Sequence, residues 1–257
     1  MMGRPAAGMR DDAAAPASAP RAAVAPLASP ETPDERGVTE LAAGFGIALV
    51  ALIAFALIAG HLYDQEAIAL DNVVTPVVHS IQSPVVDAAM EAITSLGSAT
   101  VLAVVSVIAV IVIASRRQAA QALFVVTAIA GSVALNGTLK VTVQRPRPVL
   151  PWAHVLPDYS FPSGHTMNAL VLYLAIALVM WVTLGRRFGS IAVLVALGIA
   201  IAVGVSRIYL GYHYLSDVVG GLAAGIAWLL VVALAYETIP RAWGRRRRGP
   251  RDMRPPT

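Results

Sequence analysis

The sequence contains no cysteine, a single lysine and few charged side chains of any kind. Only 13% of its 257 residues are Asp, Glu, Lys or Arg. Without cysteine, the chain has neither a disulfide framework nor thiolate chemistry. No cluster of Asp, Glu or His has the spacing of metal ligands, so neither a metal nor another cofactor is expected. What remains is a chain dominated by apolar residues.

Hydrophobic residues make up 57% of the chain, and six runs reach the length of about 20 residues that crosses a bilayer. The segment 62–95 instead mixes short apolar groups with acidic residues and two prolines, which predicts one or two short amphipathic helices at the membrane surface. We therefore expect an all-α polytopic membrane protein, with its domain at 39–239. The predicted transmembrane helices are 41–60, 96–114, 119–139, 165–184, 188–205 and 215–236.

Two tails flank this domain. Residues 1–38 are rich in Ala and Pro and have no apolar periodicity, which predicts a disordered tail. The first apolar run begins too late and is too long for a secretory signal. Residues 240–257 form a basic tail that contains Arg245 to Arg248. We expect this run to fix topology and to contact anionic lipids, and we expect no nucleic-acid partner.

The positive charges predict the orientation in a cell membrane. Six spans place both termini on one side. That side, with its turns 115–118 and 185–187, holds fifteen of the nineteen Lys and Arg residues. By the positive-inside rule it is cytoplasmic. The outward loops then carry only four cations, which are Lys140, Arg145, Arg147 and Arg207.

The richest stretch of ionisable residues lies between the last two apolar runs. His213 and Asp217 are four residues apart, which places them on one face of a helix. Asp217 can then accept the Nδ1–H of His213 and leave Nε2 free as a nucleophile or base. Arg207 adds a forked cation suited to phosphate oxygens. This combination indicates phosphoryl chemistry.

Three motifs in the chain resemble the signature of the type 2 phosphatidic acid phosphatase (PAP2) family, which is related to the vanadium haloperoxidases. They are Lys140-(six residues)-Arg147-Pro148, Pro162-Ser163-Gly164-His165 and Ser206-Arg207-(five residues)-His213-(three residues)-Asp217. The match covers 140–217 by motif, and the six-helix arrangement extends it to about 41–237. Eleven specified positions in order make the match specific. Because the positive-inside rule places 140–164 and 206–214 outside, we expect the active site at the outer face of the membrane.

The resemblance also implies a role for each motif residue. His213 attacks phosphorus and forms a phosphohistidine, Asp217 orients it, and His165 protonates the leaving oxygen and then activates water. The remaining motif residues bind the phosphate through cations or through backbone N–H groups at a helix start, and they are Lys140, Arg147, Arg207, Ser163 and Gly164. Arg145 lies outside the pattern, and both a substrate contact and an interfacial anchor remain open for it.

The expected activity is metal-independent hydrolysis of a lipid phosphate at the outer face of the membrane. A polyprenyl diphosphate is the favoured substrate, because the cations Lys140, Arg147 and Arg207, with Arg145 nearby, could hold two phosphates. Phosphatidic acid and phosphatidylglycerophosphate come next. The alternatives are a phosphotransferase, which would need an acceptor other than water, and a non-catalytic lipid-phosphate transporter. The expected partners are the lipid phosphate and membrane lipids; the oligomeric state is not predicted.

Overall fold

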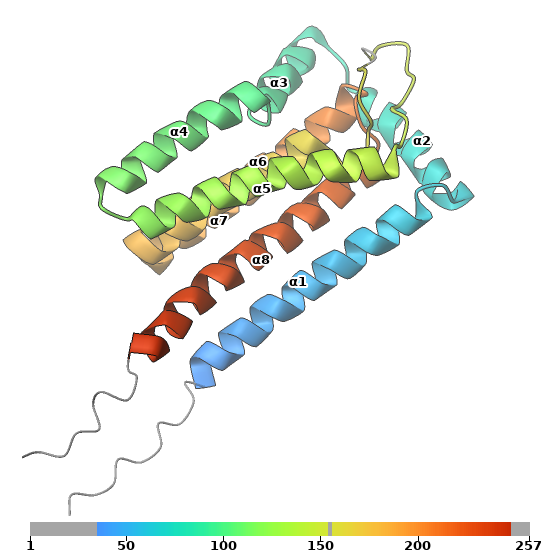
Figure 1. Ribbon diagram of the computed structural model, residues 1–257. Coiled ribbons are helices and arrows are strands. Elements are labelled where there is room, and N and C mark those ends of the chain that lie inside the picture. The colour runs from blue at the N-terminus through green and yellow to red at the C-terminus, as the bar shows by residue number, and fades with distance from the viewer. Residues whose placement is uncertain (1–34, 154–155, 248–257) are drawn as a thin grey trace, which may run out of the picture. The chain divides into compact units, whose positions relative to one another are not determined.

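The computed structural model describes residues 35–153 and 156–247, with the side chains of 35–41, 65–67 and 237–247 left out. All regular elements in this part are helices, which confirms the all-α prediction (Figure 1). The predicted tails, 1–38 and 240–257, lie outside it except where α1 and α8 begin and end. The helices are α1 (Glu35–His61), α2 (Gln65–His79), α3 (Pro84–Ser95), α4 (Ala99–Ser115), α5 (Ala119–Val143), α6 (Gly164–Leu184), α7 (Arg186–Tyr209) and α8 (Leu215–Arg247).

Five of these helices are long and apolar enough to cross a membrane, so this is a multi-pass membrane protein. They are α1, α5, α6, α7 and α8. The predicted span at 96–114 corresponds to α4, whose 17 residues rise about 26 Å, short of a hydrocarbon core of about 30 Å. It becomes a sixth span only together with α3, from which it is bent by 48°. Helices α2 and α3 lie within 62–95, where short helices are expected.

The break between α3 and α4 has a local cause. Ser98 caps α4, because its hydroxyl accepts a hydrogen bond from the Val101 N–H at 3.3 Å. Gly97 packs so closely that a Cβ there would lie 2.8 Å from Val203 and 3.0 Å from the His165 carbonyl oxygen. A larger residue would push this turn away. The turn is thereby seated on the start of α6 and the second half of α7.

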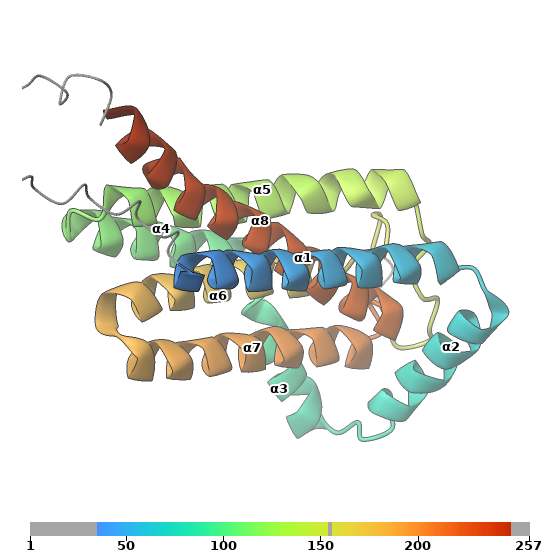
Figure 2. The same cartoon turned by 90° about the horizontal axis from the view of Figure 1, so that it is seen from below.

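Helix α6 packs against α5, α7 and α8. Small residues let α8 approach it closely, as is common between membrane helices. A Cβ at Gly221 would lie 2.9 Å from the Ser163 carbonyl oxygen, and one at Gly225 would lie 2.9 Å from Leu170. As a result, the start of α6 and the start of α8 share one end of the bundle with the ends of α5 and α7. The 144–163 connection and α2 lie at the same end (Figure 2).

Candidate active site

The three motifs meet at this end of the bundle. Helix α5 supplies its last turn, α6 its first turn, α7 its last turn and α8 its first turn, so Lys140 and His213, 73 positions apart in the sequence, line one cavity. A cavity of about 870 Å³ opens here. The motif residues that line it are Lys140, Arg147, Gly164, His165, Arg207 and His213. The structure therefore brings together most of the residues that the sequence singles out.

His213 is buried and its ring is held from both sides. Nδ1 lies 3.3 Å from Asp217 Oδ2, and Nε2 lies 3.2 Å from Nη1 of Arg147. A carboxylate only accepts and a guanidinium only donates, so the proton belongs on Nδ1 and the lone pair on Nε2. Burial lowers the pKa of His213 to about 4, although Asp217 acts in the opposite direction. The ring is therefore neutral at pH 7, with Nε2 at the cavity wall.

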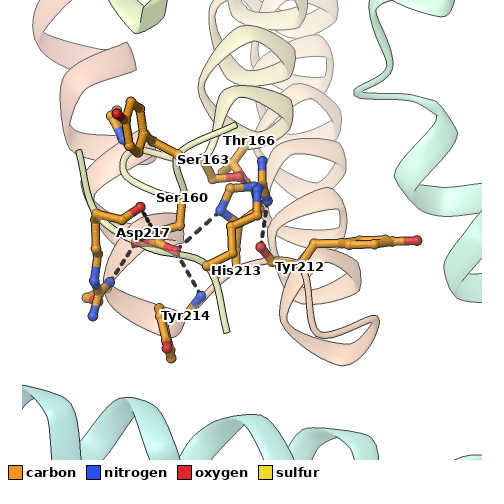
Figure 3. Close-up of polar contacts among 12 residues, drawn as sticks. Ser160, Ser163, Thr166, Tyr212, His213, Tyr214 and Asp217 are labelled. Atoms are coloured by element: carbon orange, nitrogen blue, oxygen red, sulfur yellow. Dashed lines mark hydrogen bonds and ion pairs between the residues drawn. The ribbon is translucent and has the colours of Figure 1, made fainter. Parts of the chain in front are cut away.

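Asp217 is fixed by its place in the first turn of α8. Its Oδ2 also accepts the Tyr214 N–H at 3.0 Å, which closes half of a capping box at the helix start (Figure 3). The preceding turn is tied to α7, because the Tyr212 and His213 N–H groups donate to the Arg207 carbonyl oxygen at 3.0 and 3.3 Å. The imidazole and its carboxylate are thus placed by backbone hydrogen bonds at both ends.

Two of the expected phosphate ligands already hold a carboxylate. Asp158 receives a hydrogen bond from Lys140 Nζ at 2.6 Å and another from Arg147 Nη2 at 2.6 Å. Burial tends to raise the pKa of Asp158, but the hydrogen bonds from Lys140 and Arg147 outweigh it and bring the pKa to about 2. Asp158 is therefore ionised at any working pH, and it lines the cavity beside His213. The sequence motifs gave no sign of it.

Arg207 is the third cation and the one with spare hydrogen-bonding capacity. Its Nη1 donates to Thr94 Oγ1 at 3.2 Å, and its guanidinium lies 4.2 Å from the centre of the Tyr212 ring. Its Nε is buried and has no hydrogen-bond partner in the described part of the chain. A buried N–H group without a partner is costly. Arg207 lines the cavity, so its guanidinium is placed to contribute a positive charge there.

The residues of the Pro-Ser-Gly-His motif have two different positions in the structure. Gly164 and His165 line the cavity at the start of α6. Ser163 does not: its N–H donates to the Asp217 carbonyl oxygen at 3.0 Å, and its hydroxyl pairs with Thr166 at 2.9 Å. Ser163 thus links α6 to α8 and its N–H is already used, and the role expected for it in phosphate binding stays a prediction. Gly164 is required sterically, because a Cβ there would lie 2.8 Å from Asn136 Oδ1.

Arg145 does not line the cavity as a substrate contact would, and it is too deeply buried to be an interfacial anchor. It is buried and bridges two carboxylates, with Nη1 2.6 Å from Asp217 Oδ1 and Nη2 2.7 Å from Asp71 Oδ2. The ion pair with Asp217 raises the pKa of Arg145 in spite of its burial. Asp71 belongs to α2, which is separated from the motifs by several helices in the sequence. Neither its burial nor this pairing is visible in the sequence.

Apolar walls continue the cavity away from the charged end. They come from α4 and α5, and the side chains of Val107 and Val133 are 57% and 54% exposed on the outside of the described protein. Between Lys140 and Ile129, both of which line the cavity, α5 rises about 16 Å. One leaflet of a hydrocarbon core is about 15 Å thick. The site is thus a charged head with an apolar extension one leaflet deep.

Comparison with known proteins agrees with this arrangement. A family model described as the PAP2 superfamily matches residues 121–241. Phosphatidylglycerophosphatase B of Bacillus subtilis is 30% identical over 190 residues, covering 73% of this chain and 93% of the relative. A crystal structure of a transmembrane PAP2-type phosphatidylglycerolphosphate phosphatase from Bacillus subtilis has a TM-score of 0.70 and 27% identity, covering 75% of this chain and 96% of that one. The chain therefore belongs to the PAP2 superfamily, and it is a phosphatase.

A second relative resembles a smaller part of the chain. The undecaprenyl-diphosphatase BcrC of Bacillus subtilis is 36% identical over 106 residues, which cover 39% of this chain and 50% of the relative.

In residues 35–153 and 156–247, no group of three or more His, Asp or Glu side chains is placed to hold a metal ion.

Proposed function

We propose that this protein hydrolyses the phosphate monoester of a membrane lipid, with phosphatidylglycerophosphate as the leading candidate, by way of a phosphohistidine on His213. One observation carries the proposal. A single cavity joins the His213 ring, His165 and Arg207 at its charged end to an apolar extension between α4 and α5. A lipid has the same two parts in the same order. A soluble phosphate would make no use of the extension.

The reaction uses the groups in the positions described above. When the phosphate binds, Arg147 Nη1 transfers its hydrogen bond from Nε2 of His213 to a phosphate oxygen and frees the Nε2 lone pair. Nε2 then attacks phosphorus, the bond from phosphorus to the lipid oxygen breaks, and protonated His165 gives its proton to that oxygen. In the second step His165 takes a proton from water, the water oxygen attacks phosphorus, and the phosphorus–nitrogen bond breaks to release inorganic phosphate. Asp217 keeps the proton on Nδ1 and stabilises the positive charge that the ring acquires.

The charges around the cavity favour a monoester. While His165 is neutral, three cations, Lys140, Arg147 and Arg207, less the carboxylate of Asp158, leave a net charge of +2, and the proton that His165 carries into the first step makes it +3. A phosphate monoester carries about −1.5 to −2 at pH 7. The sequence-based preference for a diphosphate counted Arg145 as a nearby cation, but Arg145 is already paired with Asp71 and Asp217. The charge argument for a diphosphate therefore weakens, and the order of candidate substrates changes.

The relatives support the same choice. Phosphatidylglycerophosphatase B aligns with nearly its whole length, whereas the undecaprenyl-diphosphatase aligns with half of its own. Undecaprenyl diphosphate remains the second candidate because of that similarity. Both substrates are anionic lipids, and the burial of each methylene of their chains contributes about 0.8 kcal/mol.

The cations also bear on metal dependence and on orientation. Lys140, Arg147 and Arg207 would stabilise the phosphate charge that a divalent ion stabilises in other phosphatases, so we propose a metal-independent reaction. We further propose that the termini are cytoplasmic and the cavity faces outward, since arginines are concentrated at the other end of the spans. Water is the proposed acceptor in place of a second lipid, because the relatives described above are named as phosphatases.

The test is a phosphate-release panel on the purified protein in detergent. It would compare phosphatidylglycerophosphate, phosphatidic acid, undecaprenyl diphosphate and p-nitrophenyl phosphate, with His213→Ala as the blank. The proposal predicts a kcat/KM for phosphatidylglycerophosphate at least tenfold above that for p-nitrophenyl phosphate. Equal values for the two would contradict the lipid assignment. Loss of the substrate only when an acceptor lipid is added, with the phosphate recovered on that acceptor and not as inorganic phosphate, would indicate the phosphotransferase instead.

A further inference from the structure

Two charged residues outside the three motifs lie against the carboxylate of Asp217. Asp71 and Arg145 are 2% and 4% exposed. Taking ions out of water costs several kcal/mol each, and hydrophobic residues of similar volume often serve stability as well or better. A buried pair of this kind is therefore weak evidence for a purely stabilising role. Its position next to the nucleophile suggests another role.

The contacts form one chain from α2 to the His213 ring. Asp71 Oδ1 accepts the Ser216 N–H at 3.0 Å, which attaches α2 to the first turn of α8. Asp71 Oδ2 accepts from Arg145 Nη2 at 2.7 Å, and Arg145 Nη1 donates in turn to Asp217 Oδ1 at 2.6 Å. The other oxygen of Asp217 faces Nδ1 of His213. Besides its uncharged donors, each oxygen of Asp217 thus faces a different ring or guanidinium: Arg145 at Oδ1, which is cationic, and His213 at Oδ2, which becomes cationic during the reaction.

The charge of Arg145 would harm catalysis if it were not balanced. Asp217 with Arg145 alone forms a neutral unit, which would do little to stabilise the positive charge on His213. Addition of Asp71 makes the unit net negative again. Arg145 also lies 4.3 Å from the centre of the Tyr214 ring, so its guanidinium is fixed in the plane that serves both carboxylates. The geometry therefore separates two tasks: Arg145 holds Asp217 in place, and Asp71 balances Arg145.

We propose that Asp71 is a positioning residue for the phosphatase reaction, acting through Arg145 to keep the Asp217 carboxylate oriented and negative toward His213. This rests on the proposed role of His213 as the nucleophile. Asp71 lies on α2, ahead of the segment 121–241 that matches the superfamily. The three motifs alone therefore do not complete the site, and a helix expected only to lie at the membrane surface contributes to it.

The test compares single and double variants in detergent with phosphatidylglycerophosphate as the probe. Outer partners of metal-ligating histidines typically contribute 10- to 100-fold, and we expect a loss of the same order for a partner of the carboxylate that orients His213. We expect Asp71→Asn to lower kcat about 100-fold and to change KM less than about threefold, because no substrate ligand is altered. We expect the double variant Asp71→Asn/Arg145→Gln to recover to within about tenfold of wild type, since Asp217 regains its net charge when the guanidinium is removed.

A merely structural network would behave differently. Because Asp71 and Arg145 are in contact, partial recovery in the double variant is expected of any ion pair. A structural role would lower the melting temperature and leave the pH profile of the folded protein unchanged, and that result, or a double variant no more active than Asp71→Asn, would overturn the proposal. If Asp71→Asn does not fold, the double variant still decides, because it removes both members of the Asp71–Arg145 pair and leaves Asp217 with its hydrogen bonds from His213 Nδ1 and the Tyr214 N–H. It must then retain kcat within about tenfold of wild type, and a larger loss in a folded double variant would overturn the proposal. Folding is checked by thermal unfolding and by a single peak in size-exclusion chromatography.

Two controls separate this proposal from the proposed function. Asp87→Asn makes the same substitution at a partly buried residue of α3 that accepts from Tyr209 and is not in this chain of contacts. It should keep kcat within about twofold, and a loss as large as that of Asp71→Asn would overturn the proposal. The second control is the pH profile. The titration of His213 depends on the charged or titratable groups around it, which are Asp217, Arg147, Arg207 and His165. Asp71→Asn should move the acid limb of kcat/KM to lower pH, and an unmoved limb would count against the proposal. Activity in His213→Ala would instead contradict the proposed function itself.

Discussion

Replacing Asp158 by Asn changes the charge of the cavity with almost no change in volume. The carboxylate accepts from Lys140 Nζ and from Arg147 Nη2, both at 2.6 Å, so it competes with an incoming phosphate for the same two cations. Without it, both cations face the substrate. We therefore expect Asp158→Asn to lower KM for lipid phosphates, with kcat within about threefold of wild type.

The magnitude follows from the exposure of Asp158. Two unit charges about 4 Å apart interact by about 1 kcal/mol in water and by about 4 kcal/mol at an effective dielectric constant of 20. The Asp158 side chain is 52% exposed, so solvent screens it and the lower value applies. About 1 kcal/mol corresponds to roughly a fivefold change in affinity. KM should fall about fivefold for a monoester, and further for undecaprenyl diphosphate, which carries more charge.

The assay is phosphate release in mixed micelles at pH 7, with both lipids and at two salt concentrations. Asp64→Asn is a matched control, since Asp64 is 58% exposed, lies after α1 and does not line the cavity. It should leave both KM values unchanged. An unchanged or higher KM in Asp158→Asn would refute competition by the carboxylate, and would mean that Asp158 holds the cations in the positions that bind phosphate.

Three further predictions concern pH, metals and orientation. Burial lowers the pKa of His213 to about 4, so the ring is neutral above that pH, and the acid limb it contributes to kcat/KM should lie nearer pH 4 than pH 6.5; a limb at 6.5 would contradict this. Activity should survive EDTA within about twofold and be inhibited by orthovanadate, whereas loss in EDTA with recovery on adding a divalent ion would contradict metal independence. In the cysteine-free chain, Val149→Cys and Tyr159→Cys should react with an impermeant thiol reagent from outside the cell and Gln118→Cys should not, and reversed labelling would place the site in the cytoplasm.

The sequence predicts the helices well where one physical signal dominates. Apolar runs identify α5, α6 and α7 to within a few residues at most ends, because burial in hydrocarbon requires them to be long and uninterrupted. The run at 96–114 is more difficult. Hydropathy does not reveal that Gly97 and Ser98 start a new helix, since that break depends on a cap and on close packing against Val203.

For the site, the motifs predict which residues take part, and only the structure shows where their side chains point. Arg145 and Arg147 are only two residues apart, yet Arg147 reaches the cavity and Arg145 turns toward α2. Gln144 precedes them in a left-handed conformation (φ 53°), which ends α5 and sets the path of the following segment. The partner of Arg145 is Asp71, far away in sequence. Only the tertiary packing of α2 on α7 and α8 brings it there.

The claim that His213 carries the phosphoryl group can be measured by rapid quench with a lipid labelled in its phosphate. The account predicts a transient, acid-labile label on His213, located by peptide mapping, and a longer lifetime of that label in His165→Ala, which lacks the group that activates water. His213→Ala should release no phosphate above the uncatalysed rate. A label on any other residue would contradict this claim. Turnover by His213→Ala at more than about 1% of the wild-type rate would also contradict it, because the nucleophile would then contribute less than about 3 kcal/mol to the lowering of the barrier.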